Sequence, residues 1–301
     1  MSDFNKKPGK DKIHRFLFDK ANIRGEISSL DDVWQLMQAN HNYPEIIRQY
    51  LGEVVAASVL LSATLKFEGS LTIQASGDSA LTLMVVECRN DFGVRGVAKF
   101  QQDMLNEISQ QTDIKMLLGD GNLIITIEQF KTKERYQGIV ALEGNSIADF
   151  LEGYLERSEQ LETRIFLASD EKAVAGLLLQ QLPGQREADD SWERITHLGS
   201  TIKPEELLGL EAKEILHRLY HEEDVRLFEA ESIYFKCTCS RDKVTNMLRS
   251  ISQQEASDII KEQGNISVDC EFCGKSYQFD EIDIAGIYSK NAQPVDLSTK
   301  H

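Results

Sequence analysis

Cysteine is scarce in this chain: there are five cysteines among 301 residues. So few thiols exclude the disulfide frameworks that hold small secreted domains together. Long apolar runs are absent too, and no segment approaches the roughly 20 residues that span a bilayer. The opening MSDFNKKPGKDKIHRF is polar and lacks the apolar stretch of a secretion signal. We therefore expect a cytoplasmic protein with reduced thiols and no membrane partner.

Positive charge is also in short supply. Lys and Arg together number 33 against 49 Asp and Glu, a formal net charge of −16. A protein that binds nucleic acid through its overall field is basic, whereas this one repels phosphate and shows no local basic patch. We expect no nucleic-acid partner. Apolar residues make up 41% of the chain, enough for one large domain with a smaller one, or for two domains.

The first part of the chain mixes strands with single helices, which favours an α+β fold over a doubly wound sheet. Alternating Leu71, Ile73 and Ala75 precede a Gly77-Asp78 turn, and Leu81, Leu83 and Val85 follow as the matching face of a hairpin. Pro44 opens a long helix with one apolar face, and Ser146 caps another over 147–157. Further extended segments are predicted at 14–18, 21–28, 93–99, 122–129, 134–141, 163–168 and 174–181, with a short helix at 31–38.

An acidic stretch follows Pro183-Gly184. Residues 187–231 contain 13 acidic residues against 5 Lys or Arg, a net charge of −8. Its apolar residues keep a helical spacing, which predicts amphipathic helices joined near Gly199 and Gly209. Such helices fold only if their apolar faces rest on another surface, and a plain solvated connector is the alternative.

Four of the five cysteines lie in the last 65 residues, where the apolar core is thin. Cys237 and Cys239 form a C-x-C pair, and Cys270 and Cys273 form a C-x-x-C pair followed by Gly274. Four thiolates bind zinc tetrahedrally, and the second pair has the form of a metal knuckle between two strands. A domain this small usually needs a metal or a disulfide. We predict one zinc ion per chain in the reduced form.

The C-x-C pair also points to redox chemistry. Residues two apart in a strand lie near the upper limit of Cα separation for a disulfide, so a bond between Cys237 and Cys239 would be strained. Strained disulfides are easily reduced and are typically regulatory. An oxidant that captured the thiolates would also eject the metal, whose binding supplies about 10–16 kcal/mol in small domains.

The whole pattern resembles a known family. C-x-C, 30 intervening residues and C-x-x-C-G resemble the redox-regulated bacterial chaperone family of heat shock protein 33. EELLGLEAKEILHRLYHEEDVRLFE is similar to that family's linker helices, and VTNMLRSI and CEFCGKSYQFD are similar to its zinc domain. ERYQGIVALEGNSIADFLEGYLERSEQLETR resembles the end of its N-terminal domain, although the family usually has EPYQG. The similarity covers nearly the whole chain from about His14.

The resemblance implies a domain order and a mechanism. Residues 1–12 are a disordered N-terminus, 13–184 an α+β substrate-binding domain, 185–236 a helical acidic linker, and 237–301 a small zinc domain. The reduced, zinc-bound form is inactive. Oxidation forms the disulfides Cys237–Cys239 and Cys270–Cys273, releases zinc and unfolds the linker. The protein then holds unfolded clients without ATP and is not an enzyme; the oxidised form is expected to be a homodimer.

Other signals are weaker. CGKS at 273–276 resembles the end of a phosphate-binding loop but lacks its first glycine. His217 and His221 are one helical turn apart and are interpreted as exposed helix residues, and Cys88 as a small buried core residue. Two alternative functions remain open, a thiol-disulfide oxidoreductase using Cys270 and Cys273, and a zinc-ribbon binding protein.

Overall fold

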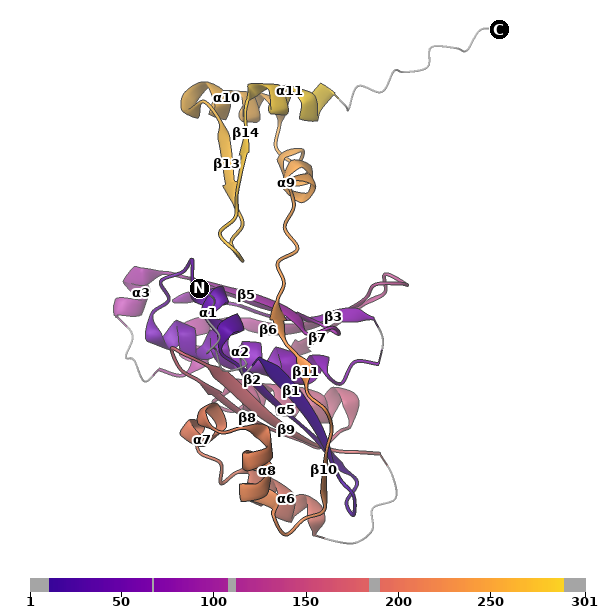
Figure 1. Ribbon diagram of the computed structural model, residues 1–301. Coiled ribbons are helices and arrows are strands. Elements are labelled where there is room, and N and C mark those ends of the chain that lie inside the picture. Colours follow the sequence, from indigo (N-terminus) through magenta and orange to yellow (C-terminus); the bar gives the residue numbers. More distant parts are fainter. Residues whose placement is uncertain (1–10, 67, 108–111, 184–189, 290–301) are drawn as a thin grey trace, which may run out of the picture. The chain divides into compact units, whose positions relative to one another are not determined.

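The computed structural model describes residues 11–66, 68–107, 112–183 and 190–289 (Figure 1). The chain divides into two compact units, an N-terminal unit of residues 1–236 and a C-terminal unit of residues 237–301. The predicted disordered N-terminus is 1–12. Residues 1–10 lie outside the described residues, and Lys12 already belongs to the first strand. The mixture of antiparallel sheets and single helices confirms the α+β class.

Two sheets form the framework of the N-terminal unit. In the described chain, the first sheet contains six strands: β8 (Thr163–Ser169), β9 (Val174–Gln181), β2 (Ile23–Leu30), β1 (Lys12–Phe18) and, both paired with β1, β10 (Val225–Leu227) and β11 (Glu231–Ser232). The second runs in the order β12 (Tyr234–Phe235), β5 (Gly93–Phe100), β4 (Leu81–Arg89), β3 (Gly69–Ser76), β6 (Asn122–Gln129) and β7 (Arg135–Val140). Neighbouring strands are antiparallel except β12 and β5, which are parallel.

The predicted hairpin exists, but its second strand presents a different face. β3 and β4 pair from Ser70↔Arg89 to Ser76↔Leu83. A register shift between Leu81 and Leu83 inverts the alternation, so that Met84, Val86 and Cys88 are buried while Leu83 and Val85 are half-exposed. The prediction that Leu83 and Val85 form the inner face is therefore wrong, because a bulge inserts one residue that strict alternation does not anticipate.

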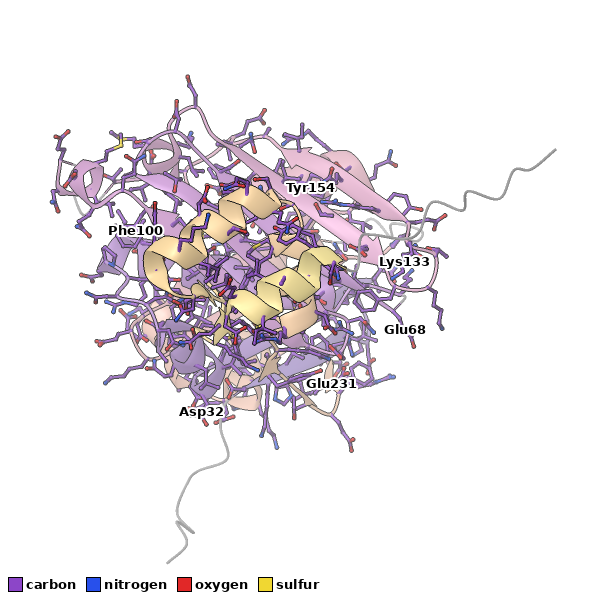
Figure 2. The ribbon with its side chains drawn as sticks, turned by 90° about the horizontal axis from the view of Figure 1, so that it is seen from above. Asp32, Glu68, Phe100, Lys133, Tyr154 and Glu231 are labelled. Atoms are coloured by element: carbon purple, nitrogen blue, oxygen red, sulfur yellow. The ribbon has the colours of Figure 1, made fainter. Side chains whose placement is uncertain are left out.

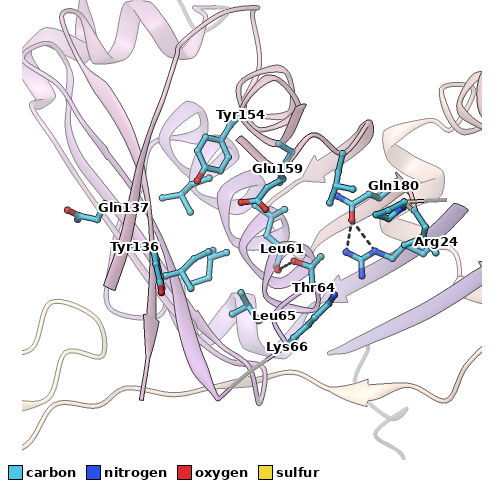
Figure 3. Close-up of a pocket in the computed structure, with 17 residues that line it drawn as sticks. Arg24, Leu61, Thr64, Leu65, Lys66, Tyr136, Gln137, Tyr154, Glu159 and Gln180 are labelled. Carbon is cyan, nitrogen blue, oxygen red and sulfur yellow. Dashed lines mark hydrogen bonds between the residues drawn. The ribbon is translucent and has the colours of Figure 1, made fainter. Parts of the chain in front are cut away.

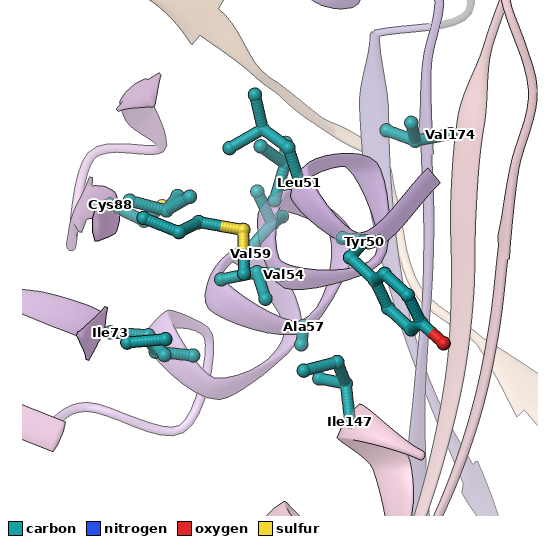
Figure 4. Close-up of a cluster of buried hydrophobic side chains, with 14 of the residues drawn as sticks. Tyr50, Leu51, Val54, Ala57, Val59, Ile73, Cys88, Ile147 and Val174 are labelled. Carbon is teal, nitrogen blue, oxygen red and sulfur yellow. The ribbon is translucent and has the colours of Figure 1, made fainter. Parts of the chain in front are cut away.

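One long helix lies between the two sheets. α2 (Glu45–Ser62) begins directly after Pro44 and contacts β2, β8 and β9 on one side and β3, β4 and β5 on the other. Its residues from Val54 to Ser62 are buried almost all round, not along one face as predicted, which is typical of a helix enclosed by two layers. Figure 4 shows Leu51, Val54 and Val59 of this helix among Ile73, Cys88 and Val174 from the surrounding strands.

Shorter helices complete the layers around α2. α5 (Ile147–Glu159) starts at a capping box, in which Ser146 accepts from the Asp149 amide and the Asp149 carboxylate accepts from the Ser146 amide. α1 (Asp32–Gln38) is the short helix predicted at 31–38, and Asp31 is its N-cap residue. α3 (Gln102–Asn106) and α4 (Ile114–Leu118) lie in the connection between β5 and β6. None of the described helices has the length and hydropathy needed to cross a bilayer.

The start of β3 and the end of β6 lie side by side in the second sheet, which brings Glu68 next to Phe130 and Lys131. The Phe130 amide donates to the Glu68 carbonyl, and Lys131 forms an ion pair with Glu68 at 3.3 Å. Glu68 and Lys133 accordingly lie along the same edge of the N-terminal unit (Figure 2). This edge carries β7, the last strand of the second sheet.

The acidic stretch packs against the outer face of the first sheet. α6 (Ser191–Gly199), α7 (Pro204–Gly209) and α8 (Ala212–Tyr220) form the predicted helices. Their apolar side chains share a buried cluster with sheet residues, namely Phe16, Phe18, Ile23, Ile27, Ala168, Ala175, Leu177 and Leu179 against Ile195, Leu207, Ala212, Ile215, Leu216 and Tyr220. The interpretation as a solvated connector is therefore wrong for residues 191–220.

Beyond α8, the predicted helical linker, 185–236, contains short strands, and its first residues, 185–189, lie outside the described residues. Residues 225–235 supply β10 and β11 to the first sheet and β12 to the second. Ion pairs hold this segment to its neighbours: Arg226 to Asp19 at 2.7 Å, Asp224 to Lys20 at 2.5 Å, and Glu231 to Arg15. The helical prediction fails here because strands of two or three residues carry no alternation that a sequence pattern can detect.

The C-terminal unit has little apolar core of its own. α9 (Arg241–Leu248) and α10 (Gln253–Gln263) precede a hairpin of β13 (Ile266–Asp269) and β14 (Ser276–Phe279), and α11 (Glu281–Ser289) follows it. The hairpin provides the two strands predicted around the second cysteine pair. Among the residues described here, eight buried side chains make up the core: Leu248, Ala256, Ile260, Ile266, Tyr277, Phe279, Ile284 and Ile287. So small a core leaves stability dependent on another source of cohesion.

Candidate metal and redox centre

The two cysteine pairs come from different parts of the C-terminal unit, and their sulfur atoms lie close together. Cys237 and Cys239 lie in an irregular segment that ends at Ser240, whose hydroxyl caps α9 by accepting from the Lys243 amide at 3.2 Å. Cys270 and Cys273 lie in the turn between β13 and β14. The cap fixes where the segment that carries the first pair joins α9, and the hairpin turn fixes the second pair.

The hairpin turn has the backbone of a metal knuckle. The amides of Cys273 and Gly274 both donate to the Cys270 carbonyl, at 3.2 and 2.7 Å, and the Cys270 amide donates to the Lys275 carbonyl at 2.9 Å. Gly274 has φ +67°, a left-handed conformation that suits glycine. The turn thereby curls beneath the two sulfurs, as the sequence predicts.

The four Sγ atoms lie within 4.8 Å of one another. Cys237 and Cys270 are separated by 3.5 Å between sulfurs, and Cys239 and Cys273 also by 3.5 Å. A disulfide requires about 2.05 Å, so all four are free thiols. A tetrahedron of sulfurs at about 2.3 Å from a zinc ion has edges of about 3.8 Å. The spacing of these donors fits such an ion, and the donor set is the one that zinc prefers.

A tyrosine hydroxyl adjusts the chemistry of one sulfur. Tyr277 donates to the Sγ atom of Cys239 at 3.1 Å. Burial raises the pKa of Cys239, but the hydrogen bonds from Tyr277 and the other cysteines outweigh burial and lower the pKa to about 7. Burial raises the pKa of Cys237, and burial with the neighbouring sulfurs raises that of Cys273 to about 12. Keeping all four sulfurs ionised therefore requires a cation among them.

A second set of contacts joins the centre to the small core. Arg241, two residues after Cys239, donates to the Gln278 carbonyl at 2.9 Å and to the Asp283 carboxylate at 2.7 Å. Its guanidinium lies 4.2 Å from the ring centroid of Phe279. Arg241 thus connects α9 to β14 and α11. Sequence reasoning missed both Tyr277 and Arg241, because neither lies in a motif and only the fold brings them to the cysteines.

The other candidates lie outside this centre. Cys88 is fully buried, as predicted, and burial raises its pKa to about 12, which makes it unreactive. His217 and His221 are both exposed on α8 and its end, with ring centroids 6.0 Å apart. CGKS lies in a strand–turn–strand and does not open a helix as a phosphate-binding loop does.

One acidic cluster has a structural explanation. Asp11, Asp31 and Asp32 lie close together near the start of α1. The Asp11 carboxylate accepts from the amides of Asp31 and Val33, at 2.9 and 3.1 Å, and so satisfies the helix terminus.

Fold and site together define a class: an α+β protein with a C-terminal four-cysteine metal-binding unit. Comparison with known proteins identifies a family within that class. The sequence model of the family described as "Hsp33 protein" matches residues 11–280. The "33 kDa chaperonin" of Chromobacterium violaceum is 45% identical over 293 residues, covering 97% of this chain and 98% of the relative. That of Nitrosococcus oceani is 42% identical over 292 residues, covering 97% and 99%.

A solved structure shares the fold. The crystal structure of the 33 kDa chaperonin (heat shock protein 33 homolog) from Thermotoga maritima matches with a TM-score of 0.78 at 21% identity, covering 93% of this chain and 99% of that one. This chain belongs to the Hsp33 family. The resemblance predicted from the cysteine spacing is thereby confirmed.

Proposed function

We propose that this protein is a redox-regulated chaperone that holds unfolding proteins without ATP during oxidative stress. The observation that carries the proposal is the convergence of Cys237, Cys239, Cys270 and Cys273, in a unit whose core is too small to be stable alone. The names of the relatives, which call them chaperonins, support the same function.

In the reduced state, Cys237, Cys239, Cys270 and Cys273 would hold one zinc ion. When bound, zinc supplies the positive charge that keeps four thiolates together and the free energy that folds the unit. Tyr277 positions Cys239, and the amides around Cys270 shape the turn. In this state the helices α6–α8 cover the outer face of the first sheet, and the protein is inactive.

Oxidation removes the donors. Each pair of thiolates gives up two electrons as one S–S bond forms, and one molecule of hydrogen peroxide takes up these electrons with two protons from the solvent to become two waters. We propose the pairs Cys237–Cys239 and Cys270–Cys273. Neighbours in sequence stay within reach after the unit loosens, whereas Cys237 and Cys270 are 33 residues apart and separate. With both pairs oxidised, no thiolate remains to hold a metal.

Loss of the C-terminal unit then frees the end of the linker. β11 and β12 contain two residues each, so the segment before Cys237 is held by few hydrogen bonds. Like charges on the acidic stretch favour its expansion. We propose that α6–α8 detach and bare the sheet face around Phe16, Phe18 and Ile23. An exposed apolar patch of this kind binds unfolded chains, and the net charge keeps the complex soluble.

The remaining expectations belong to the same proposal. The protein acts in the cytoplasm, has no catalytic activity and forms a homodimer when oxidised. Cys270 and Cys273 lie in a strand–turn–strand, whereas a dithiol oxidoreductase carries its C-x-x-C at the start of a helix. An insulin-reduction assay tests that alternative directly.

The decisive experiment measures metal, thiols and chaperone activity together. Reductively purified protein should contain one zinc and five titratable thiols per unfolded chain; peroxide with mild heat should leave no zinc and one thiol. Only the oxidised form should suppress light scattering by a heat-denatured client. Cys88→Ala, which removes the cysteine outside the cluster, should keep both zinc and activity. Equal protection by both forms would contradict the switch.

Peptide mapping tests the disulfide pairing. Trypsin cuts after Lys236 and Arg241, which places Cys237 and Cys239 in one peptide, and after Lys261 and Lys275, which places Cys270 and Cys273 in another. In the oxidised protein each peptide should be lighter by two hydrogens and remain separate. A dominant species in which the two peptides are joined would show the other pairing.

A further inference from the structure

A cavity of about 610 Å³ opens between the two sheets of the N-terminal unit, far in sequence from the cysteines. Its interior is apolar: Leu71 and Ile125 of the second sheet are 3% and 2% exposed, and Leu155 of α5 is 9% exposed. Leu61 and Leu65 line it from the end of α2 and the segment after it (Figure 3).

The sequence YQG on β7 forms one wall of this cavity. Tyr136 and Gln137 line it, but the Gln137 side chain points away from the cavity (Figure 3) and its Nε2 donates to the Thr126 hydroxyl at 3.0 Å. Gly138 leaves room for Tyr154 of α5, since a Cβ atom there would lie 2.5 Å from the ring and its hydroxyl oxygen. Tyr154 can therefore lie flat against β7 and serve as a wall.

The opposite end of the cavity is polar and positively charged. Arg24 donates from Nε and Nη2 to the side-chain Oε1 atom of Gln180, at 3.1 and 2.5 Å. Gln180, 2% exposed, is itself fixed because its amide donates to the Thr163 hydroxyl at 2.9 Å. Figure 3 shows the Arg24 guanidinium directed toward the end lined by Thr64 and Lys66. The guanidinium is thus held in place before any ligand arrives.

Charges at this end leave a positive excess. Arg24 and Lys66 line the cavity with one carboxylate, that of Glu159. Behind Arg24, 3.9 Å away and outside the lining, lies the buried carboxyl of Glu26. Burial raises the pKa of Glu26 to about 7, so that this group offsets Arg24 only in part at neutral pH. The lining itself carries a net charge of one, which a monoanion neutralises.

We propose that this cavity binds a small monocarboxylate with an apolar tail. The carboxylate pairs with Arg24 and Lys66, and the tail runs along Leu65 and Leu71 toward Tyr136. The volume is within the range of about 300–1,000 Å³ usual for small-molecule sites, and an apolar interior with a few fixed polar groups is their usual composition. A planar guanidinium fixed on one side offers its remaining N–H groups to a carboxylate.

Calorimetric titration of the reduced, full-length protein with dodecanoate tests the proposal, at concentrations below those at which the acid self-assembles. Saturable binding of one molecule per chain is expected. Dodecylammonium and dodecan-1-ol have the same tail without the anion. Each should bind at least about tenfold more weakly, because it lacks one charge-assisted hydrogen-bonded pair, which contributes about that factor to affinity. No saturable binding of dodecanoate, or equal binding of dodecylammonium, would overturn the proposal.

Two variants and a control locate the head group. Lys66→Met changes an exposed side chain and Arg24→Met a half-buried one; each should weaken dodecanoate binding about tenfold. Arg135→Met removes an exposed charge on the same strand as Tyr136, outside the lining, and should leave the affinity unchanged. Unaltered binding by both Lys66→Met and Arg24→Met overturns the site. If the protein binds phosphatidylglycerol vesicles but not dodecanoate, the proposal that the cavity binds a free carboxylic acid is wrong.

Discussion

The two compact units are stabilised in different ways. In the part of the chain that the structure describes, the N-terminal unit buries two apolar clusters of 43 and 14 side chains, whereas the C-terminal unit buries eight. Burial of apolar area drives folding in the first. The second places four sulfurs within 4.8 Å of one another, which without a cation adds desolvation cost and no attraction.

Under the proposed function, this difference allows one chain to contain both a stable scaffold and a redox sensor. A unit held by packing changes stability gradually as single contacts are lost. A unit held by a four-thiolate metal site would lose its main source of stability when the thiolates are oxidised. The linker segment connects the two, since 191–220 packs on the first sheet and 234–235 ends directly before the cysteines.

The largest expected effect comes from removing the metal ligands. Cys270→Ser together with Cys273→Ser should abolish zinc binding and unfold the C-terminal unit, because a structural zinc site contributes about 10–16 kcal/mol. The two-sheet framework of the N-terminal unit should stay folded, while the linker helices loosen as proposed above. Limited proteolysis followed by mass spectrometry checks this, with rapid cuts expected after residue 190, where α6 begins, and a persistent fragment before it. Equal resistance of both units would contradict the comparison.

Truncating a side chain in the packed core should destabilise the N-terminal unit and leave the C-terminal unit unchanged. Leu60→Ala in α2 removes a fully buried side chain that contacts Gly176, and should destabilise the N-terminal unit by about 2–5 kcal/mol. Zinc content should not change. Chemical denaturation monitored at Trp34 measures the loss. Ile139→Ala, on β7 and 78% exposed, is the control and should change stability by less than about 0.5 kcal/mol.

A buried carboxyl should give the N-terminal unit a characteristic pH dependence. Burial raises the pKa of Glu26 from 4.5 to about 7, so the unfolded chain releases this proton at lower pH than the folded one. Its stabilising contribution is present below pH 4.5 and is lost as the pH rises through 7. Glu26→Gln should therefore raise stability at pH 8 relative to pH 5 by about 3 kcal/mol.

Denaturation midpoints at the two pH values measure this effect. Glu134→Gln, at an exposed position of the same unit, should leave the pH dependence as in the unaltered protein. A parallel pH profile for Glu26→Gln and the unaltered chain would show that Glu26 does not titrate in this range.

The smallest predicted effect concerns the tyrosine hydroxyl that contacts Cys239. Tyr277→Phe removes the hydroxyl that donates to Cys239 and should lower zinc affinity about 10- to 100-fold. Competition with a chromogenic chelator measures it. Tyr288→Phe removes a hydroxyl bonded to the Leu248 carbonyl in the same small core and should leave the affinity within about twofold. Equal losses in both variants would mean that Tyr277 acts through packing alone.

Sequence patterns identify the parts of this fold that repeat regularly. The strands from β1 to β9, the caps of α1 and α5 and the cysteine hairpin all follow local rules, and the structure contains them. The cysteine spacing indicates the family before any geometry is known, because C-x-C followed by C-x-x-C-G resembles the motif of that family. The predicted centre uses these residues, whose sulfurs lie together.

Features that depend on tertiary contacts escape such patterns. The bulge after Leu81 reverses the faces of β4, and the enclosure of α2 by two sheets buries residues on all its sides. β11 and β12 exist because neighbouring edges offer them partners. Tyr277 is an ordinary strand residue in the sequence and acquires its role only when the hairpin brings it to Cys239. In each case the deciding contact lies far away along the chain.

Hydrogen exchange of the full chain before and after peroxide treatment tests the central claim most directly. The account predicts that oxidation removes protection from the C-terminal unit and from residues 191–235, while β3, β4 and β6 keep theirs. Client protection should appear at the same oxidant dose. Retained protection of 191–220 in an oxidised, zinc-free protein that holds clients would contradict the account, because the sheet face it assigns to clients would still be covered.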